Sequence, residues 1–377
     1  MSSFVLMVIA NIAIFLFLCY SCLIIFYWWG WKSATEFICQ PNTATISVSV
    51  IVPARNEEKN IAAVLRALEQ QTYPRDLVQV IVANDQSTDN TAAIAKSFSG
   101  TTIIHLNGEP STAHKKRAIE QAIKIATGDL IMTTDADCVP PPNWIQTVVS
   151  FCKENKSRFV AAPVAFQNNS SMLQVFQALD FLVLQGITGA SVMKNVHSMC
   201  NGANIAYEKN AFLDVKGFDG IDNIASGDDM LLMHKIWRQF PGQVHYLKSK
   251  EAVVVTQPMT TWKDFFYQRI RWASKATFYD DKRIFWALLL VYLFNLSFLA
   301  LLVAGFWFHV LWMYLIIFLV AKTVIELPFV YSIAKFFNKQ SLLPYLLLFQ
   351  PLHITYTILI GCFGQFGKYE WKGRRVR

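Results

Sequence analysis

Acidic side chains cluster at three positions that each directly follow a hydrophobic segment. These positions are Pro53-Ala54-Arg55-Asn56-Glu57, Asp85, and the pair Asp135 and Asp137. Two carboxylates separated by one residue can face the same pocket where a strand ends, and oxygen ligands of this kind suit Mg²⁺ or Mn²⁺. Because the sequence contains neither of the standard glycine-rich phosphate loops, we expect a metal and basic side chains to hold any phosphate groups.

A second pair of carboxylates, Asp228 and Asp229, precedes an apolar helical segment that starts at Met230. Acidic residues at this position stabilise a helix start by themselves, because they accept hydrogen bonds from free backbone N–H groups and suit the helix dipole. Where a helix start lies in a metal pocket, a carboxylate there can also serve as a general base. Both roles are open to Asp229.

The segment Gln268-Arg269-Ile270-Arg271-Trp272 lies in an amphipathic stretch that begins at Thr261. Its aromatic and aliphatic residues, such as Phe265, predict a face toward the membrane surface, with basic residues opposite. Arg271 can bind phosphate oxygens, and Trp272 can pack its ring against a sugar. The alternative is a membrane-surface helix that takes no part in chemistry.

The hydrophobic segments before these groups are predicted to be strands of one sheet. Strands are expected at 46–52, 77–83, 101–106 and 129–134, and helices at 57–71 and 115–126. Continuous apolar strands that alternate with helices predict a parallel sheet covered on both faces. Ligands of such sheets bind at the carboxyl ends of the strands, which is where the acidic groups lie.

Uncharged segments flank this α/β region. Of the 377 residues, 54% are hydrophobic and 16% are charged, compared with about 25% charged residues in soluble domains. This composition excludes intrinsic disorder and a purely soluble enzyme. Residues 4–29 carry no charge and are long enough to span a bilayer. They lack a positive n-region and a small-residue cleavage site, so we expect an uncleaved membrane anchor rather than a signal peptide.

Two more uncharged segments follow the α/β region. Residues 284–321 are long enough for two helices joined near 305–309, and the second must extend past Lys322 and Glu326. These two side chains lie one helical turn apart, so they either neutralise each other or have a function within the membrane. Residues 342–363 contain Pro351 and either cross the membrane or form a broken re-entrant segment. The re-entrant form is favoured because it keeps the basic C-terminal tail on the cytoplasmic side.

Positive charge gathers beside the uncharged segments. Residues 260–283 carry six basic and three acidic side chains, and residues 368–377 carry five and one, which accounts for nearly all of the net charge of +8. This distribution predicts cytoplasmic surfaces that face anionic lipid, and it does not favour nucleic acid as a partner. Seven scattered cysteines without a Cys-x-x-Cys pair argue against a disulfide framework or zinc site and for a reducing environment.

These motifs, in this order, resemble the membrane-bound glycosyltransferases of family 2, which have the GT-A fold. The resemblance covers residues 46–275. It rests on the segment 53–57, Asp85-x-Ser87-x-Asp89-x-Thr91, Asp135-x-Asp137, and Gly227-Asp228-Asp229 followed by Gln268-x-x-Arg271-Trp272. The chain looks most like the group that includes ceramide glucosyltransferases and the cellulose, chitin and hyaluronan synthases.

The resemblance implies a role for each matching residue. Asp229 would be the catalytic base, and Asp135 and Asp137 would be the metal ligands. The acceptor site would be formed by Asn201, Gly202 and Trp272. The nucleotide sugar would be contacted by Pro53, Ala54, Glu57, Asp85, Lys115, Asp135, Gln268 and Arg271. Two positions depart from the family pattern. His114 replaces a common glycine before Lys115, and Asp228 replaces a common glutamate.

The resemblance further implies a metal-dependent, inverting hexosyltransferase that uses a nucleotide sugar, most simply a UDP-sugar, as donor. The acceptor is expected to be a lipid; processive polysaccharide synthesis, nucleotidyl transfer and a non-catalytic scaffold are the alternatives. The expected organisation is a membrane anchor (1–30), a GT-A domain (44–258), an interfacial segment (259–283), a membrane region (284–363) and a basic tail (364–377). The protein is then a multi-pass membrane protein with its α/β domain on the cytoplasmic face.

Overall fold

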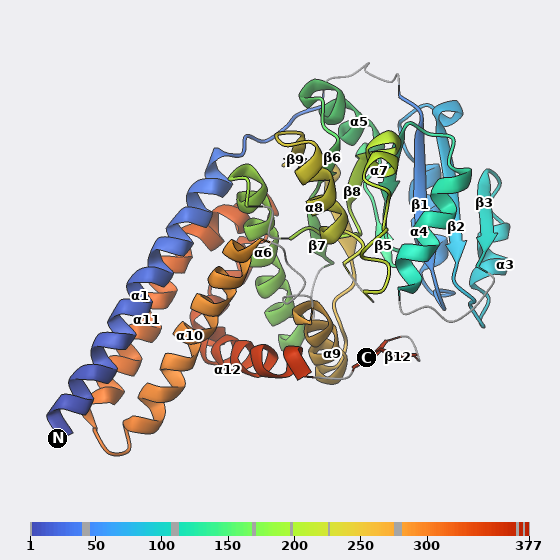
Figure 1. The fold of residues 1–377 in the computed structure, drawn as a ribbon. Coiled ribbons are helices and arrows are strands. Elements are labelled where there is room, and N and C mark those ends of the chain that lie inside the picture. Colours follow the sequence, from blue (N-terminus) through green and yellow to red (C-terminus); the bar gives the residue numbers. More distant parts are fainter. Residues whose placement is uncertain are drawn as a thin grey trace.

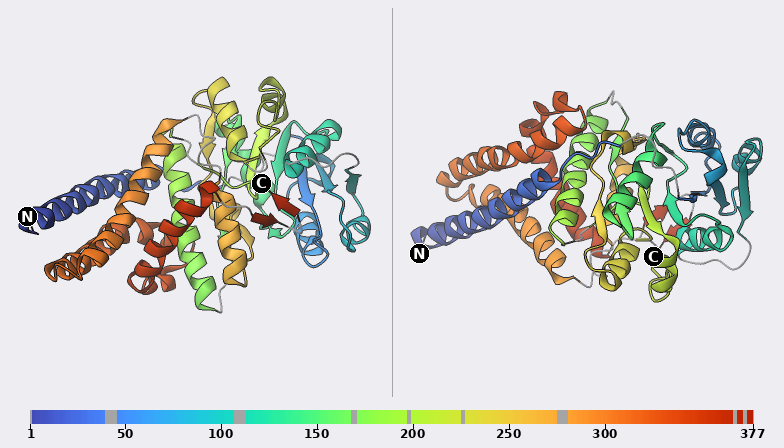
Figure 2. Two further views of the ribbon diagram at one scale, coloured as in Figure 1. Left: turned by 60° about the horizontal axis from the view of Figure 1, so that its bottom comes forward. Right: turned by 90° about the horizontal axis from the view of Figure 1, so that it is seen from above.

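The computed structural model describes residues 2–39, 46–106, 113–167, 171–196, 199–224, 227–274, 281–366, 369–371 and 374–376. An α/β domain lies next to a set of long helices (Figure 1). The N-terminus is at the far end of the long helices, away from the α/β domain (Figure 2).

A seven-stranded sheet forms the centre of the α/β domain, with the strand order β3-β2-β1-β4-β8-β6-β9. The strands are β1 (Val48–Ala54), β2 (Val78–Asn84), β3 (Thr101–His105), β4 (Leu130–Thr133), β6 (Phe159–Ala161), β8 (Ile205–Glu208) and β9 (Val244–Tyr246). The first four are parallel, whereas β8 runs antiparallel to both β4 and β6. The predicted parallel sheet is therefore confirmed, with strand boundaries shifted by one or two residues.

Helices pack against both faces of this sheet. They are α2 (Ile61–Glu69), α3 (Thr91–Lys96), α4 (His114–Ile125), α5 (Trp144–Asn155), α7 (Lys209–Asp214) and α8 (Met230–Gln239). Successive side chains of a strand point to opposite faces. Accordingly, Ile51 in β1 packs in one apolar cluster with α4, whereas its neighbours Val50 and Val52 pack in a second cluster with α2 and α5.

Smaller elements complete the α/β domain and the chain end. A three-stranded sheet has the order β5-β10-β7, formed by β5 (Cys138–Val139), β10 (Val254–Thr256) and β7 (Val164–Phe166). Within the described ranges, short 3₁₀ turns occur at η1 (Arg75–Leu77), η2 (Lys250–Ala252) and η4 (Gln340–Leu342). Within the predicted basic tail, β11 (Tyr369–Trp371) and β12 (Arg374–Val376) pair in antiparallel fashion; residues 367–368, 372–373 and 377 lie outside the described residues.

Five helices in the described part of the chain are long and apolar enough to cross a membrane. They are α1 (Ser2–Ser33), α6 (Met172–Met193), α10 (Lys282–Ala304), α11 (Val310–Phe336) and α12 (Tyr345–Phe366). In α11, the Nζ of Lys322 donates to Glu326 at 2.6 Å and to Gln350 of α12 at 2.7 Å. The hydroxyl of Tyr20 in α1 also donates to Glu326. The predicted Lys322–Glu326 pair is thus confirmed, and it joins three helices.

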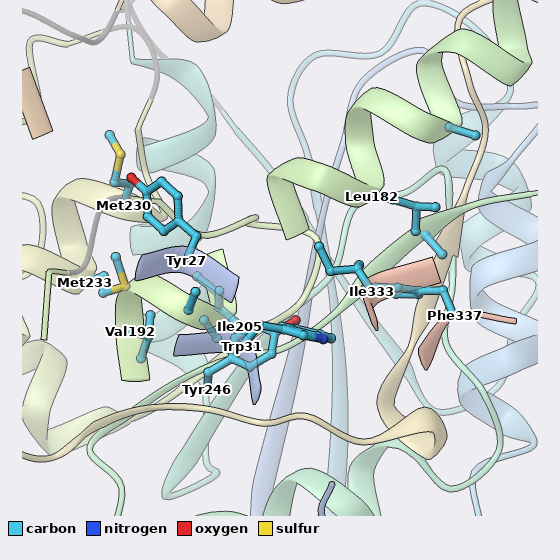
Figure 3. Close-up of a cluster of buried hydrophobic side chains, with 14 of the residues drawn as sticks. Tyr27, Trp31, Leu182, Val192, Ile205, Met230, Met233, Tyr246, Ile333 and Phe337 are labelled. Carbon is cyan, nitrogen blue, oxygen red and sulfur yellow. The ribbon is translucent and has the colours of Figure 1, made fainter. Parts of the chain in front are cut away.

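Helix α6 connects the long helices to the α/β domain. It lies against α1 and α11 at two glycines, because a Cβ on Gly186 would lie 2.1 Å from Ile333 of α11 and one on Gly30 of α1 would lie 2.9 Å from Ala190. A cluster of buried side chains, including Trp31 from α1 and Tyr246 from β9, extends across this contact (Figure 3). The two parts of the molecule therefore share one apolar core.

Three expectations need correction or extension. Pro351 lies inside α12, which continues from Tyr345 to Phe366, so the break expected in 342–363 is not there; a proline is tolerated inside such a helix where neighbouring helices pack against it. Helix α6 was not predicted as a long apolar helix. In α9 (Trp262–Ala273), Phe265 is fully buried and Arg269 is 2% exposed, so one residue of the predicted apolar face packs inside the protein, whereas Phe266 and Ile270 of that face stay partly exposed.

Candidate active site

The residues singled out in the sequence meet in one cavity of about 230 Å³. All of them line it: Pro53, Ala54, Glu57, Asp85, Lys115, Asp135, Asp137, Asn201, Gly202, Asp229, Gln268, Arg271 and Trp272. They come from the ends of β1, β2 and β4, from the starts of α4 and α8, and from α9. The expected convergence at the carboxyl ends of the parallel strands is confirmed.

Hydrogen bonds to backbone groups hold the segments after β1 and β2 together. The N–H of Asp85 donates to the carbonyl of Ala54 at 2.8 Å, and the Arg55 guanidinium donates to the carbonyl of Asp85 at 2.7 Å. The N–H of Glu57 donates to the hydroxyl of Thr91 at 2.7 Å. These contacts leave the Asp85 side chain at the cavity wall, where only 8% of its surface is exposed.

The end of β4 presents a group of metal-ligand atoms. One atom each from Asp135, Asp137 and Cys138 lies within 4.8 Å of the other two. Burial and the neighbouring carboxylates raise the pKa of the Cys138 thiol well above its usual value, and this thiol lies 3.4 Å from the Asp137 carboxylate, to which it donates. The two aspartates therefore supply the oxygen ligands, which fits a hard divalent cation.

Lys115 joins carboxylates from two different elements. Its Nζ lies 2.7 Å from Asp135 after β4 and 3.1 Å from Asp228 at the start of α8. Burial alone would lower the pKa of this ammonium, but Asp135, Asp228 and Asp229 hold it above its usual value. The preceding residue, His114, lies 3.7 Å from Asp85, so both residues at this departure from the family pattern face acidic groups.

Asp229 is held in place by two backbone N–H groups. Its Oδ1 accepts from Met230 at 2.7 Å, which caps α8, and its Oδ2 accepts from Gly202 at 2.9 Å. A carboxylate has about four lone-pair sites, so each oxygen can accept a further proton or hydrogen bond. A Cβ on Gly202 would lie 3.0 Å from the Nζ of Lys115 and 3.1 Å from Asp228, which explains why the smallest residue stands there.

The charge of the cavity wall bears on which ligands it can hold. Six acidic and three basic side chains line it, the basic ones being Arg55, Lys115 and Arg271. This leaves a net formal charge of −3, which would repel a diphosphate. A divalent cation at Asp135 and Asp137 would offset that repulsion, so the lining itself fits a metal.

Helix α9 closes the cavity with Gln268, Arg271 and Trp272. Between them, Arg269 points into the protein and donates to Asp180 of α6 at 2.7 Å. Its guanidinium lies 4.2 Å from the centre of the Trp272 ring. Sequence reasoning missed this role, because the partner Asp180 is 89 residues away; a basic residue in an otherwise apolar helix face was the available signal.

Asn204 has a different role from its neighbours Asn201 and Gly202. Its side chain donates to the carbonyls of Pro163 and Ala252 at 2.7 Å each and accepts from the Trp144 indole at 2.9 Å. It is 1% exposed and does not line the cavity. Asn204 therefore fixes the loop that carries the cavity residues.

Residues 49–215 match the model of the family described as Glycosyl transferase family 2. The chain contains a family 2 glycosyltransferase domain. The probable glycosyltransferase YdaM of Bacillus subtilis is 27% identical over 233 residues, 60% of this chain and 54% of the relative. Glycosyltransferase AglE of Haloferax volcanii is 35% identical over 108 residues, 27% of this chain and 34% of the relative. The chain thus spans about half of the length of the first relative and about a third of the length of the second.

A solved structure shows the same fold for the family 2 domain and its flanking helices. It is the mannosyltransferase PcManGT from Pyrobaculum calidifontis in complex with GDP-Man and Mn²⁺. The two chains are 19% identical with a TM-score of 0.60, and the match covers 92% of this chain and 99% of the other. The expected GT-A architecture is therefore confirmed.

Proposed function

We propose that this protein transfers a sugar from a nucleotide-sugar donor to a lipid acceptor in the membrane, with inversion at the anomeric carbon. The observation that carries the proposal is the single cavity in which the β1, β2 and β4 carboxylates, Asp229 and the α9 residues meet. The family 2 match supports the reaction class, and the five long apolar helices support a membrane location. The basic segments beside these helices support a cytoplasmic α/β domain.

The donor is proposed to bind along the strand ends. Pro53, Ala54, Glu57 and Asp85 would surround the base and ribose of a nucleotide, most simply uridine. The diphosphate would then lie toward Lys115, Gln268 and Arg271. Mg²⁺ or Mn²⁺ at Asp135 and Asp137 would neutralise charge on the diphosphate as it leaves.

The chemical step is a single displacement. The acceptor oxygen forms a bond to the anomeric carbon while the bond from that carbon to the diphosphate oxygen breaks, and the nucleoside diphosphate leaves with the electron pair. Asp229 takes the proton of the acceptor hydroxyl. Arg271 and Lys115 stabilise the negative charge that grows on the leaving group. Because the attack comes from the side opposite the leaving group, the anomeric configuration inverts.

The acceptor is proposed to approach from the side of Asn201, Gly202 and Trp272. A relative from Staphylococcus aureus, 40% identical over 93 residues and matching 24% of each chain, is named 4,4'-diaponeurosporenoate glycosyltransferase. That name gives 4,4'-diaponeurosporenoate, a small organic molecule, as the compound that the relative glycosylates, which supports a small-molecule acceptor here over a growing polysaccharide.

The test is a panel of radiolabelled uridine, guanosine and thymidine diphosphate sugars, given to the purified protein in lipid nanodiscs with and without Mn²⁺. We expect metal-dependent transfer from one donor, with the label in the organic phase. A high-mass ladder would show processive polysaccharide synthesis instead. If no donor gives nucleoside diphosphate release or calorimetric binding, the protein is a scaffold and the proposal is wrong.

A further inference from the structure

A second cavity, of about 420 Å³, lies among the long helices. This volume is within the range of about 300–1,000 Å³ found for small-molecule sites. Four residues line both this cavity and the candidate active site: Phe181, Asn201, Asp229 and Trp272. The two cavities therefore meet at the proposed base.

Hydrocarbon side chains from five helices form most of the wall of this second cavity. They include Leu23 of α1, Ile187 of α6, Val291 of α10, Phe329 of α11 and Leu346 of α12. All five helices are candidate membrane spans. A hydrophobic chain that enters from the bilayer would gain about 0.8 kcal/mol for each CH₂ group that it removes from water, and here it would also lie beside Asp229.

Charged groups in this wall are mostly paired. The lining carries three carboxylates, Asp180, Asp229 and Glu326, one guanidinium, Arg269, and the imidazole of His353. Arg269 is paired with Asp180 at 2.7 Å, and Glu326 is paired with Lys322 at 2.6 Å; His353 lies 3.9 Å from Asp180. Asp229 shares the single ammonium of Lys115 with Asp135 and Asp228, so three carboxylates around one cation keep the junction negative.

The negative charge at the junction determines which head group of a lipid can bind there. A phosphate monoester at the junction would face the Asp229 carboxylate, and the cations of this wall are already matched by carboxylates. A neutral hydroxyl can instead donate its hydrogen bond to that carboxylate. The same hydrogen bond brings the proton to the group that is proposed to remove it.

We propose that the second cavity holds the hydrocarbon tail of the acceptor, and that the acceptor is an uncharged lipid alcohol rather than a lipid phosphate. The proposal rests on the proposed function, whose acceptor it specifies. The tail lies between α1, α6, α10, α11 and α12, and the hydroxyl lies at Asp229. Leu288 of α10 lines the cavity and is 43% exposed, so the wall of the cavity includes a residue that is also exposed at the protein surface.

The test uses photoaffinity labelling of the full chain in nanodiscs, without any donor. The probes are a long-chain alcohol with a diazirine in mid-chain and the phosphate monoester of the same alcohol. We expect the alcohol to label cavity residues of α6 and α10, and to do so about tenfold more strongly than its phosphate, which corresponds to about 1.4 kcal/mol. Equal or stronger labelling by the phosphate would overturn the uncharged head group.

Variants with larger side chains in the second cavity test whether the alcohol binds there. Ala287→Trp on α10 and Val183→Phe on α6 each put a large side chain into the cavity, and either should reduce labelling of the cavity residues at least about fivefold. The matched control is Leu299→Trp, at a residue of α10 that is 42% exposed and does not line the cavity, which should leave that labelling unchanged. Labelling that is insensitive to both cavity variants would contradict the proposal.

Donor binding separates this proposal from the proposed function. Titration calorimetry with uridine and guanosine diphosphates and Mn²⁺ needs no lipid and should give the same affinity in all four proteins, which also shows that the variants fold. If nucleotide binding is absent in the unmodified protein, the proposed function fails, while the labelling result still decides whether a lipid alcohol occupies the cavity.

Discussion

Lys115 is the residue on which the electrostatics of the candidate active site depend most. It connects Asp135, a proposed metal ligand, with Asp228 beside the proposed base, at 2.7 and 3.1 Å. These are short charge-assisted contacts, and they keep two acidic groups from different elements close together. In the proposed function, the same ammonium faces the diphosphate of the donor.

Replacing Lys115 with methionine keeps the length of the side chain but removes its charge. We expect the affinity for the donor to fall at least about tenfold, or 1.4 kcal/mol, because the net negative charge of the cavity increases. Lys115→Arg keeps the charge and should retain more of the affinity. Calorimetric titration with the nucleoside diphosphate checks this, and unchanged affinity in Lys115→Met would exclude a phosphate-side role.

The same variant gives a pH prediction. A lysine whose folded pKa is raised contributes stability that is fully present below its unfolded pKa of about 10.4 and is lost only as pH rises through the folded pKa. The difference in melting temperature between wild type and Lys115→Met should therefore be constant from about pH 6 to about pH 9. A difference that shrinks within this range would contradict the raised pKa.

Individual site residues could be predicted from the sequence where they follow a strand. Asp85 and Asp135 directly follow predicted strands, and parallel strands bring their carboxyl ends to one edge. Arg269 could not be predicted in the same way, because its environment depends on Asp180 in a distant helix. The spacing of apolar residues predicted that Phe265 of α9 faces the membrane surface. Phe265 is instead buried, because it packs against α6 and α12.

At the scale of elements, the buried pair of Arg269 and Asp180 fixes α9 against α6. These side chains are 2% and 7% exposed, and Arg269 also lies against the rings of Phe265 and Trp272. Because α9 contributes Gln268, Arg271 and Trp272 to the cavity, the position of this helix determines the shape of the site. Arg269 lies 4.2 Å from the centre of the Trp272 ring, and we propose it as a positioning residue for that ring.

Removing one partner of this pair should cost more than removing both. Arg269→Met leaves Asp180 buried without its cation, and we expect a loss of about 3–5 kcal/mol in the free energy of unfolding. The double variant Arg269→Met with Asp180→Leu should recover a large part of it, since apolar side chains can replace a buried ion pair. Denaturation of the wild type, the single variant and the double variant in detergent measures this.

Activity measurements distinguish positioning from stability alone. If Arg269 orients Trp272, Arg269→Met should raise the KM for the acceptor and leave the KM for the donor nearly unchanged. An equal stability of the single and double variants, or equal changes in both KM values, would contradict the role given to this pair.

At the scale of the whole molecule, the site joins the α/β domain to the long helices, because its lining combines the ends of β1, β2 and β4 with Phe181 of α6. Helix α6 belongs to the chain region of the α/β domain, yet it packs against α1 and α11 through Gly30 and Gly186. Sequence patterns predicted the α/β domain and the flanking apolar helices separately. They could not predict the contact between them, because Asp180 interrupts the apolar run of α6 and only the assembled helices neutralise that charge.

The position of the site has a consequence for its chemistry. In the proposed function, a soluble donor would reach the strand ends and a membrane-embedded acceptor would reach Asp229, without either substrate leaving its own phase. The account therefore depends most on the assignment of Asp229 as the base that joins the two substrates. Asparagine caps a helix as well as aspartate does, so Asp229→Asn removes the base while it preserves the start of α8.

The most direct test measures sugar transfer and donor binding by the Asp229→Asn protein in nanodiscs, with Asp137→Asn as the comparison. We predict that Asp229→Asn binds the donor within about twofold of wild type but transfers sugar about 10²–10⁴-fold more slowly, whereas Asp137→Asn loses metal-dependent donor binding. Near-normal transfer by Asp229→Asn would contradict the central claim.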